Sequence, residues 1–112
     1  MNDTTQKHHV RIDSAMELAW KNRSEQPIPI ACLHLGNVSI LSLPGEPMVD
    51  FQLYTQKFAD KRHVFVAGYG DCGPAYICTE KSFTEGGYEP YASHVIPESE
   101  KTLKSAIEKV IS

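Results

Sequence analysis

The chain has 112 residues, of which 41% are hydrophobic and 22% charged, and its formal net charge is −3 at pH 7. This length fits one domain, over residues 1–112, and is too short for two independent cores. Because the acidic balance comes without a cluster of lysine or arginine, nucleic acid is excluded as a partner. No run approaches the roughly 18 apolar residues of a transmembrane helix, so we expect a soluble chain with no transmembrane segment.

The first residues, MNDTTQKHHVRID, are polar where a signal peptide would need an apolar core. We therefore expect no signal peptide in this chain, and the compartment stays open. The three cysteines, Cys32, Cys72 and Cys78, are odd in number and lack the CxxC spacing of structural zinc sites. Free thiols that are buried or half-buried are the prediction for all three.

The first half of the chain predicts a helix and a β-hairpin. Ser14 and Glu17 have the spacing of a capping box and precede a short apolar stripe, which indicates a helix over about 13–23. Two apolar runs, about 28–35 and 38–43, flank the pair Gly36-Asn37. This pair suits a two-residue turn with positive φ, so the runs are predicted to be antiparallel strands.

The second half predicts a crossover helix, a third strand and a closing helix. An apolar residue recurs every three to four positions from residue 47 to about 60, and HVFVAG at 63–68 has the composition of a buried strand. Residues 69–91 are dense in glycine and tyrosine and are expected to form an ordered functional loop. A last helix begins at Pro97. The predicted fold is α/β, a small mixed sheet with a β-hairpin, a crossover helix, a third strand and a C-terminal helix.

Two segments carry a resemblance to a known family: LGNVSILSLPGEP before the long helix and YGDCGPAYICTEKSFTEGGYEP after the third strand. In order, they resemble the C-terminal part of the catalytic domain of the neutral or alkaline non-lysosomal ceramidases, with the closest likeness to uncharacterised bacterial members. The shared features are a Gly-Glu step that opens a helix and two later tyrosines twelve residues apart, here Tyr76 and Tyr88. The similarity runs from about residue 28 to 91, and members of this family are often secreted or periplasmic.

The resemblance implies that Glu46 supplies a carboxylate ligand and Tyr76 a phenol ligand to one Zn²⁺, while the Tyr88 hydroxyl points toward the scissile amide. It also implies a hydrolase that cleaves an N-acyl amide bond of a lipid-like substrate such as ceramide. The residue types suit this chemistry. A divalent cation favours the charged form of a phenol whose pKa is near 10 in water, and an uncoordinated tyrosine remains a hydrogen-bond donor for a developing oxyanion.

The chain departs from this family because it lacks the upstream segments that carry two zinc-binding histidines and a serine. Its five histidines, His8, His9, His34, His63 and His94, match none of those segments. A catalytic zinc takes about three protein ligands, so Glu46 and Tyr76 make an incomplete zinc site. We expect a fragment that is inactive without the missing half, with a complementing chain or self-association as its partners. The alternative is a non-catalytic α/β remnant or interaction domain.

Each candidate residue also has a structural interpretation. Glu46 could be a helix-start carboxylate that the helix dipole favours, and Tyr76 and Tyr88 could be amphipathic side chains that tie a loop to the core. Asp71, before Cys-Gly, is typical of a turn. The pair His8-His9 in a polar terminus is expected to bind metal only adventitiously.

Overall fold

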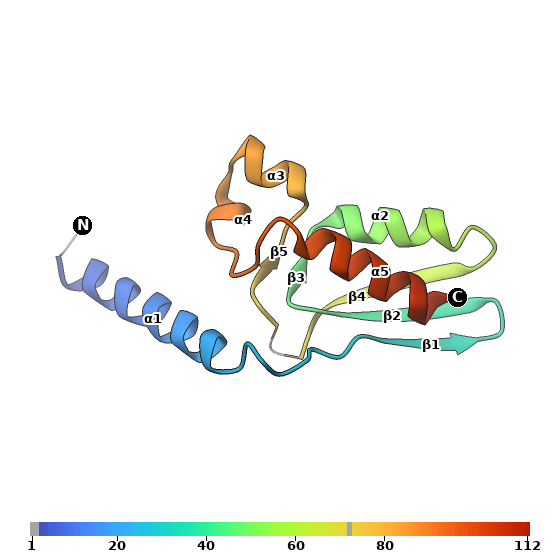
Figure 1. Cartoon of the computed structure of the whole chain (residues 1–112), viewed down its shortest axis with the longest axis horizontal. Helices are drawn as coiled ribbons and strands as arrows, with labels where there is room; N and C mark the ends of the chain where they lie inside the picture. Colours follow the sequence, from blue (N-terminus) through green and yellow to red (C-terminus); the bar gives the residue numbers. More distant parts are fainter. Residues whose placement is uncertain (1–2, 72) are drawn as a thin grey trace.

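The computed structural model describes the backbone of residues 3–71 and 73–112 and the side chains from residue 10 onward, again without residue 72. Cys72 and the side chains of His8 and His9 therefore lie outside the described residues. The molecule is elongated, with principal extents of 55 × 29 × 23 Å. A compact body holds the sheet and most helices, and the N-terminal helix α1 extends away from it (Figure 1).

The helix α1 spans Asp3–Asn22 and begins ten residues before the predicted start. The prediction was wrong because it depended on an apolar stripe, whereas the described side chains along most of α1 are exposed. A helix that projects from the body needs no apolar period along its whole length. Ser14 and Glu17, interpreted as a capping box, lie inside the helix.

The main sheet has three strands in the order β1-β2-β4. Its strands are β1 Ala31–Leu35, β2 Val38–Pro44 and β4 His63–Gly70. β1 and β2 are antiparallel and joined at Gly36, where φ is +61°, so the predicted hairpin is confirmed. β4 pairs in parallel with β2 after the crossover helix α2, Val49–Phe58.

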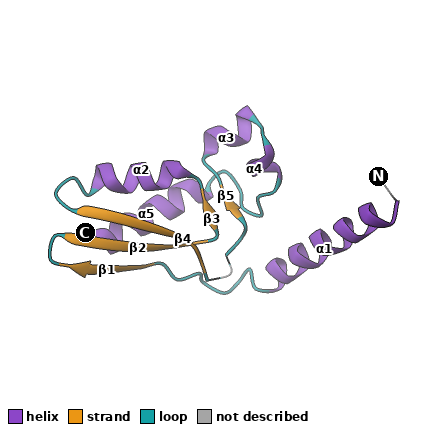
Figure 2. Ribbon diagram, turned by 180° about the vertical axis from the view of Figure 1, so that it is seen from behind, coloured by secondary structure: helices purple, strands orange, loops and turns teal. Residues whose placement is uncertain are grey.

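One face of this sheet carries the core. Leu41 and Leu43 point to that face and pack against Phe51 of α2 and Ile107 of α5, and all four side chains are fully buried. The helix α5 spans Ser99–Ile111, and its predicted apolar face is confirmed because Leu103, Ile107 and Ile111 are buried. α5 crosses in front of the sheet in Figure 1 and behind it in Figure 2.

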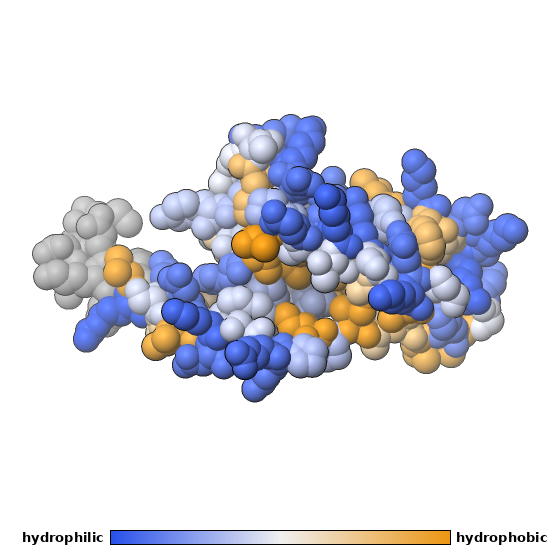
Figure 3. Space-filling model, in the orientation of Figure 1, coloured by the Kyte–Doolittle hydropathy of each residue, from blue (hydrophilic) through white to orange (hydrophobic). Residues whose placement is uncertain are grey.

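The opposite face of the sheet is exposed. Its side chains include Leu33 at 56% exposure and Phe65 at 63%, and among the described residues no helix covers it (Figure 2). Figure 3 shows the molecule from the opposite, helix-covered side, where blue hydrophilic and orange hydrophobic residues are interspersed. The strand predicted as buried at 63–68 is therefore an edge strand with one bare face, because nothing packs on its other side.

The segment predicted as a loop contains regular structure, and it forms a second, two-stranded sheet with residues that precede α2. The segment contains β5 Tyr76–Ile77, α3 Glu80–Glu85 and α4 Tyr88–Tyr91. The strand that pairs with β5 is β3, Glu46–Pro47. β3 and β5 are parallel. Glu46 therefore lies in a strand, three residues before α2, and the interpretation as a helix-start carboxylate is wrong. None of the helices formed by the described residues has the length and apolar character that a bilayer span requires.

Glu100 joins the last helix, α5, to the start of α3. Its carboxylate accepts hydrogen bonds from Lys104 and, at 2.6 Å, from the backbone N–H of Glu80 at the start of α3. The hydrogen bond from Lys104, with help from the Glu80 amide, lowers the pKa of Glu100 although partial burial raises it. The ionised carboxylate is therefore the form that stabilises the fold.

We predict that Glu100→Gln lowers the free energy of unfolding by roughly 1 kcal/mol at neutral pH, since hydrogen bonds to charged groups are the stronger ones. Because the pKa of Glu100 is depressed in the folded state, the difference from the wild type should be full above its unfolded pKa and vanish as pH falls through its folded pKa. Urea unfolding across pH measures this. The exposed neighbour Glu98, changed to Gln, is the control and should stay within about 0.5 kcal/mol; an equal loss in both variants would refute a specific role for Glu100.

Candidate functional site

The candidate site begins with a close contact between two backbone segments. Gly45 has φ of +61°, and a Cβ at this position would lie 2.6 Å from the carbonyl oxygen of Ala75. A Cβ at Gly73 would lie 2.1 Å from the Gly45 nitrogen. Both distances are far below any contact that a side-chain carbon tolerates, so only glycines allow the two segments to approach this closely.

This contact places β3 beside β5. The Glu46 amide donates to the Ala75 carbonyl at 2.7 Å, and the Met48 amide donates to the Ile77 carbonyl at 3.0 Å. In the resulting parallel register Glu46 is paired with Tyr76. Paired residues on neighbouring strands project to the same face of a sheet, so the carboxylate and the phenol predicted as zinc ligands lie side by side.

Tyr69 is a third member of the site that sequence reasoning did not single out. Its hydroxyl donates a hydrogen bond to Oε1 of Glu46 at 2.9 Å. Tyr69 has φ of +61°, and Asp71 and Ala75 also have positive φ. Three non-glycine residues in the left-handed region within seven positions are uncommon, and such strain concentrates at functional sites. The sequence signal for Tyr69 is its place directly after the apolar part of β4, but nothing local predicts its conformation.

The carboxylate of Glu46 acts on both phenols. The pKa of Tyr69 is raised by its hydrogen bond to Glu46 and by the charge of that carboxylate. The pKa of Tyr76 is raised first by burial, then by the charges of Glu46 and Tyr88, by hydrogen bonding to Glu46 and by Glu89. Without a cation, the Glu46 carboxylate therefore keeps the phenols of Tyr69 and Tyr76 neutral. A cation placed between the carboxylate and a phenol would instead favour the ionised form of that phenol.

Tyr88 contacts Tyr76. The two rings make an edge contact, with centroids 5.7 Å apart and planes at 79°. Tyr88 begins α4 and is 67% exposed, so its hydroxyl is open to an incoming molecule. The segment after α4 is held to β5 because the Ser93 hydroxyl donates to the carbonyl of Tyr76 at 2.7 Å. The structure thus brings Glu46, Tyr76 and Tyr88 into one row.

Two cavities adjoin this row. One, of about 190 Å³, is lined by Glu46 and Tyr69 together with the apolar side chains of Met48, Val49 and Val66. The other, of about 500 Å³, is lined by Tyr76 and Tyr88, by residues 91–94 and by part of α1. Each of the two predicted ligands therefore borders a cavity of its own.

The donor set suits a divalent cation but is short of a full shell. Glu46 and Tyr76 offer two oxygens of the kind that zinc accepts. Within the described residues, no three side chains of histidine, cysteine, aspartate or glutamate lie close enough together to hold a metal ion. His34 is committed elsewhere, to the Ser39 hydroxyl and the Val110 carbonyl, whereas His94 lines the cavity beside Tyr76.

The remaining predicted residues have structural places. Asp71 lies in a turn with φ of +49°, in agreement with its interpretation as a turn former. Cys32 is half-buried and Cys78 buried, and both are free thiols as predicted. Burial raises the pKa of both thiols, so neither is an activated nucleophile.

Comparison with known proteins finds no matching family model, no matching curated protein and no matching solved structure.

We predict that Gly45→Ala destabilises the protein clearly more than Gly36→Ala, although both glycines have φ of +61°. A Cβ at Gly36 meets nothing within 4 Å, so that variant should cost only the left-handed backbone penalty of about 1 to 2 kcal/mol. At Gly45 the new methyl must also push the Ala75 carbonyl away and break its bond with Glu46. Urea unfolding of the two variants measures the difference; equal losses would mean that the contact between the segments is loose.

We also predict that Glu46→Gln lowers the pKa of both Tyr69 and Tyr76 toward the ordinary value of tyrosine, because a neutral amide no longer disfavours the phenolate. The measurement is a pH titration of tyrosinate absorbance, with Tyr69→Phe and Tyr76→Phe assigning the transitions. Glu108→Gln is the matched control. It should lower only the pKa of Tyr54, whose hydroxyl donates to Glu108 and whose pKa that bond raises. Unchanged titration of Tyr69 and Tyr76 in Glu46→Gln would contradict the geometry.

Proposed function

We propose that this chain carries the carboxylate and phenol half of the zinc site of a ceramidase-like amidohydrolase, an enzyme that hydrolyses an N-acyl amide bond such as that of ceramide. The single observation that carries the proposal is the register pairing of Glu46 with Tyr76. Two residues that are thirty positions apart in the sequence are brought to one point by a two-residue sheet. Such short pairing contributes little to stability, which favours a role in positioning side chains.

Glu46 and Tyr76 would hold the ion, and the other residues have separate tasks. Tyr69 fixes one oxygen of the Glu46 carboxylate by its hydrogen bond, which leaves the second oxygen free to coordinate. When bound, Zn²⁺ would polarise the carbonyl of the amide as a Lewis acid. The exposed Tyr88 hydroxyl, next to Tyr76, is the donor available for charge that develops on the carbonyl oxygen.

The lipid-like class of the substrate rests on the resemblance. The cavity beside Glu46 is small, about 190 Å³, and its lining is mixed: Met48, Val49 and Val66 lie there together with Gln52 and Tyr69. Ceramide is one molecule of this class.

The two-donor shell favours a second candidate, a non-catalytic α/β domain that keeps the scaffold. A catalytic zinc takes about three protein ligands and water, and the row of Glu46, Tyr76 and Tyr88 supplies only two ligands. The amidohydrolase therefore requires histidines from a complementing polypeptide. The isolated chain is expected to bind Zn²⁺ weakly and to leave N-acyl amides intact.

We predict that the purified chain binds Zn²⁺ through Glu46 and Tyr76 and that added imidazole tightens binding by completing the shell. The measurement is calorimetric titration in a background in which His8 and His9 are replaced by alanine, which removes adventitious binding at the terminus. Glu46→Gln and Tyr76→Phe should each weaken binding by at least about tenfold, the lower end of what disturbing a metal site costs. Zinc should also produce tyrosinate absorbance near neutral pH in the wild type and none in Tyr76→Phe.

The control is Tyr88→Phe, which should bind Zn²⁺ like the wild type because Tyr88 is not a ligand. Zinc binding that is indifferent to both Glu46→Gln and Tyr76→Phe would overturn the metal site and leave the non-catalytic domain. Hydrolysis of a short-chain N-acyl substrate by the purified chain, abolished by Glu46→Gln, would instead show that the site is complete in this chain.

A further inference from the structure

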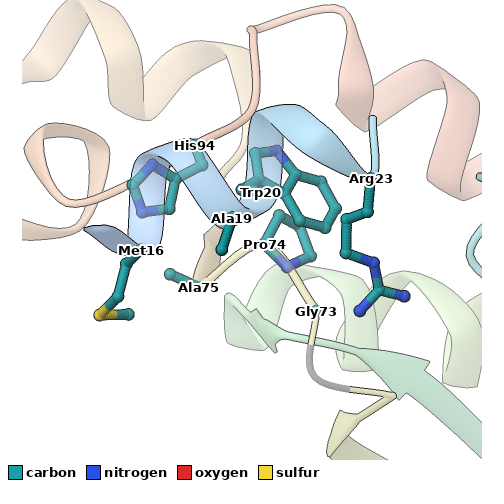
Figure 4. Close-up of a pocket in the computed structure, with 8 residues that line it drawn as sticks. All are labelled: Met16, Ala19, Trp20, Arg23, Gly73, Pro74, Ala75 and His94. Carbon is teal, nitrogen blue, oxygen red and sulfur yellow. The ribbon is translucent and has the colours of Figure 1, made fainter. Parts of the chain in front are cut away.

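The larger cavity has walls from opposite ends of the chain. It measures about 500 Å³, within the usual range for small-molecule sites. One wall is α1, through Asp13 and Glu17, and the other is formed by three tyrosines, Tyr76, Tyr88 and Tyr91. Figure 4 shows the neighbouring contact that holds α1 in place, with Trp20 of α1 lying beside Pro74.

The aromatic wall has the geometry of a corner. Tyr76 and Tyr88 meet at 79°, with centroids 5.7 Å apart, and Tyr91 extends the wall with 90% of its surface exposed. Large exposed aromatic side chains that line a cavity supply π faces to a ligand. Cations are attracted to such faces within about 6 Å of the ring centroid.

The facing wall is negative. Asp13 and Glu17 are four residues apart on α1 and therefore lie on the same side of the helix. Both line the cavity, in which His94 is the one basic side chain and no lysine or arginine is present. Among the described side chains, neither carboxylate takes part in a salt bridge. Like charges at this spacing repel each other, and a cation between them and the tyrosines would remove that repulsion.

Together the two walls select one class of ligand. An anion is excluded by the carboxylates, and a neutral apolar molecule gains nothing from them. A small metal ion would use the carboxylates but leave the aromatic corner unused. We propose that this cavity binds an organic ammonium cation, held between the tyrosine corner and the carboxylates of Asp13 and Glu17. The site goes beyond the proposed hydrolase: it shares Tyr76 and Tyr88 with it but requires neither Glu46 nor zinc.

The test compares choline with its neutral isostere 3,3-dimethylbutan-1-ol, titrated into the full chain in the presence of EDTA. Calorimetry and the fluorescence of Trp20, the single tryptophan, report binding. Choline should bind several-fold more tightly than the alcohol, in line with the worth of cation–π contacts at exposed rings. Equal affinity for the two compounds, or no saturable binding of choline, would overturn the proposal.

The variants are matched in charge. Glu17→Gln and Asp13→Asn should each weaken choline binding several-fold, whereas Glu25→Gln, the same change just beyond α1, should leave it unchanged. Tyr91→Leu removes an exposed ring on which folding does not depend and should also weaken binding several-fold. If Glu25→Gln weakens binding as much as Glu17→Gln, the effect is only net charge and the proposal fails.

One further variant separates this site from the zinc site. Glu46→Gln should weaken zinc binding and leave choline binding unchanged, whereas Glu17→Gln should weaken choline binding and leave zinc binding unchanged. Loss of choline binding in Glu46→Gln, with the fold intact by circular dichroism, would show that the two sites are one and would overturn the separate cation site.

Discussion

The contact between the backbones at Gly45 and Gly73 is the constraint on which the candidate site depends. Two segments, one ending β2 and the other following β4, approach so closely that neither glycine position has room for a Cβ. The hydrogen bonds of β3 and β5 follow from this approach, and so does the pairing of Glu46 with Tyr76. Because the pairing is only two residues long, it is not stable by itself. It depends on the main sheet, whose strands β2 and β4 lead into the two segments.

The consequence is electrostatic. The carboxylate of Glu46 raises the pKa of both Tyr69 and Tyr76. In the absence of a ligand, both tyrosines are therefore neutral and donate hydrogen bonds to this carboxylate. The arrangement is stable without a ligand, since the Tyr69 hydroxyl satisfies one carboxylate oxygen. A cation bound there, as we propose, would favour the ionised form of Tyr76.

The elements that the sequence predicts correctly are those specified by local chemistry. Gly36-Asn37 fixes the hairpin, and the apolar stripe through Leu103 and Ile107 fixes α5. The start of α1 was missed because a helix that projects from the body has no apolar stripe along its first half. Glu46 and Tyr76 could be named from motifs, but their adjacency depends on a nonlocal two-residue pairing that has no periodicity. Tyr69 could not be predicted either, because its approach to Glu46 requires a left-handed backbone that nothing in the local sequence indicates.

The two proposed sites draw on one property of this region, which is negative charge facing tyrosine rings. Glu46 and Glu89 act on Tyr76 from one side, and Asp13 and Glu17 face it across the larger cavity. Negative charge beside a phenol disfavours its ionised form, and a cation nearby offsets that charge. The corner at Glu46 is built on rigid backbone and suits an ion that demands fixed ligands. The larger cavity has one wall from the C-terminal half of α1, and it suits a bulkier, more weakly hydrated cation whose attraction to aromatic faces tolerates small displacements.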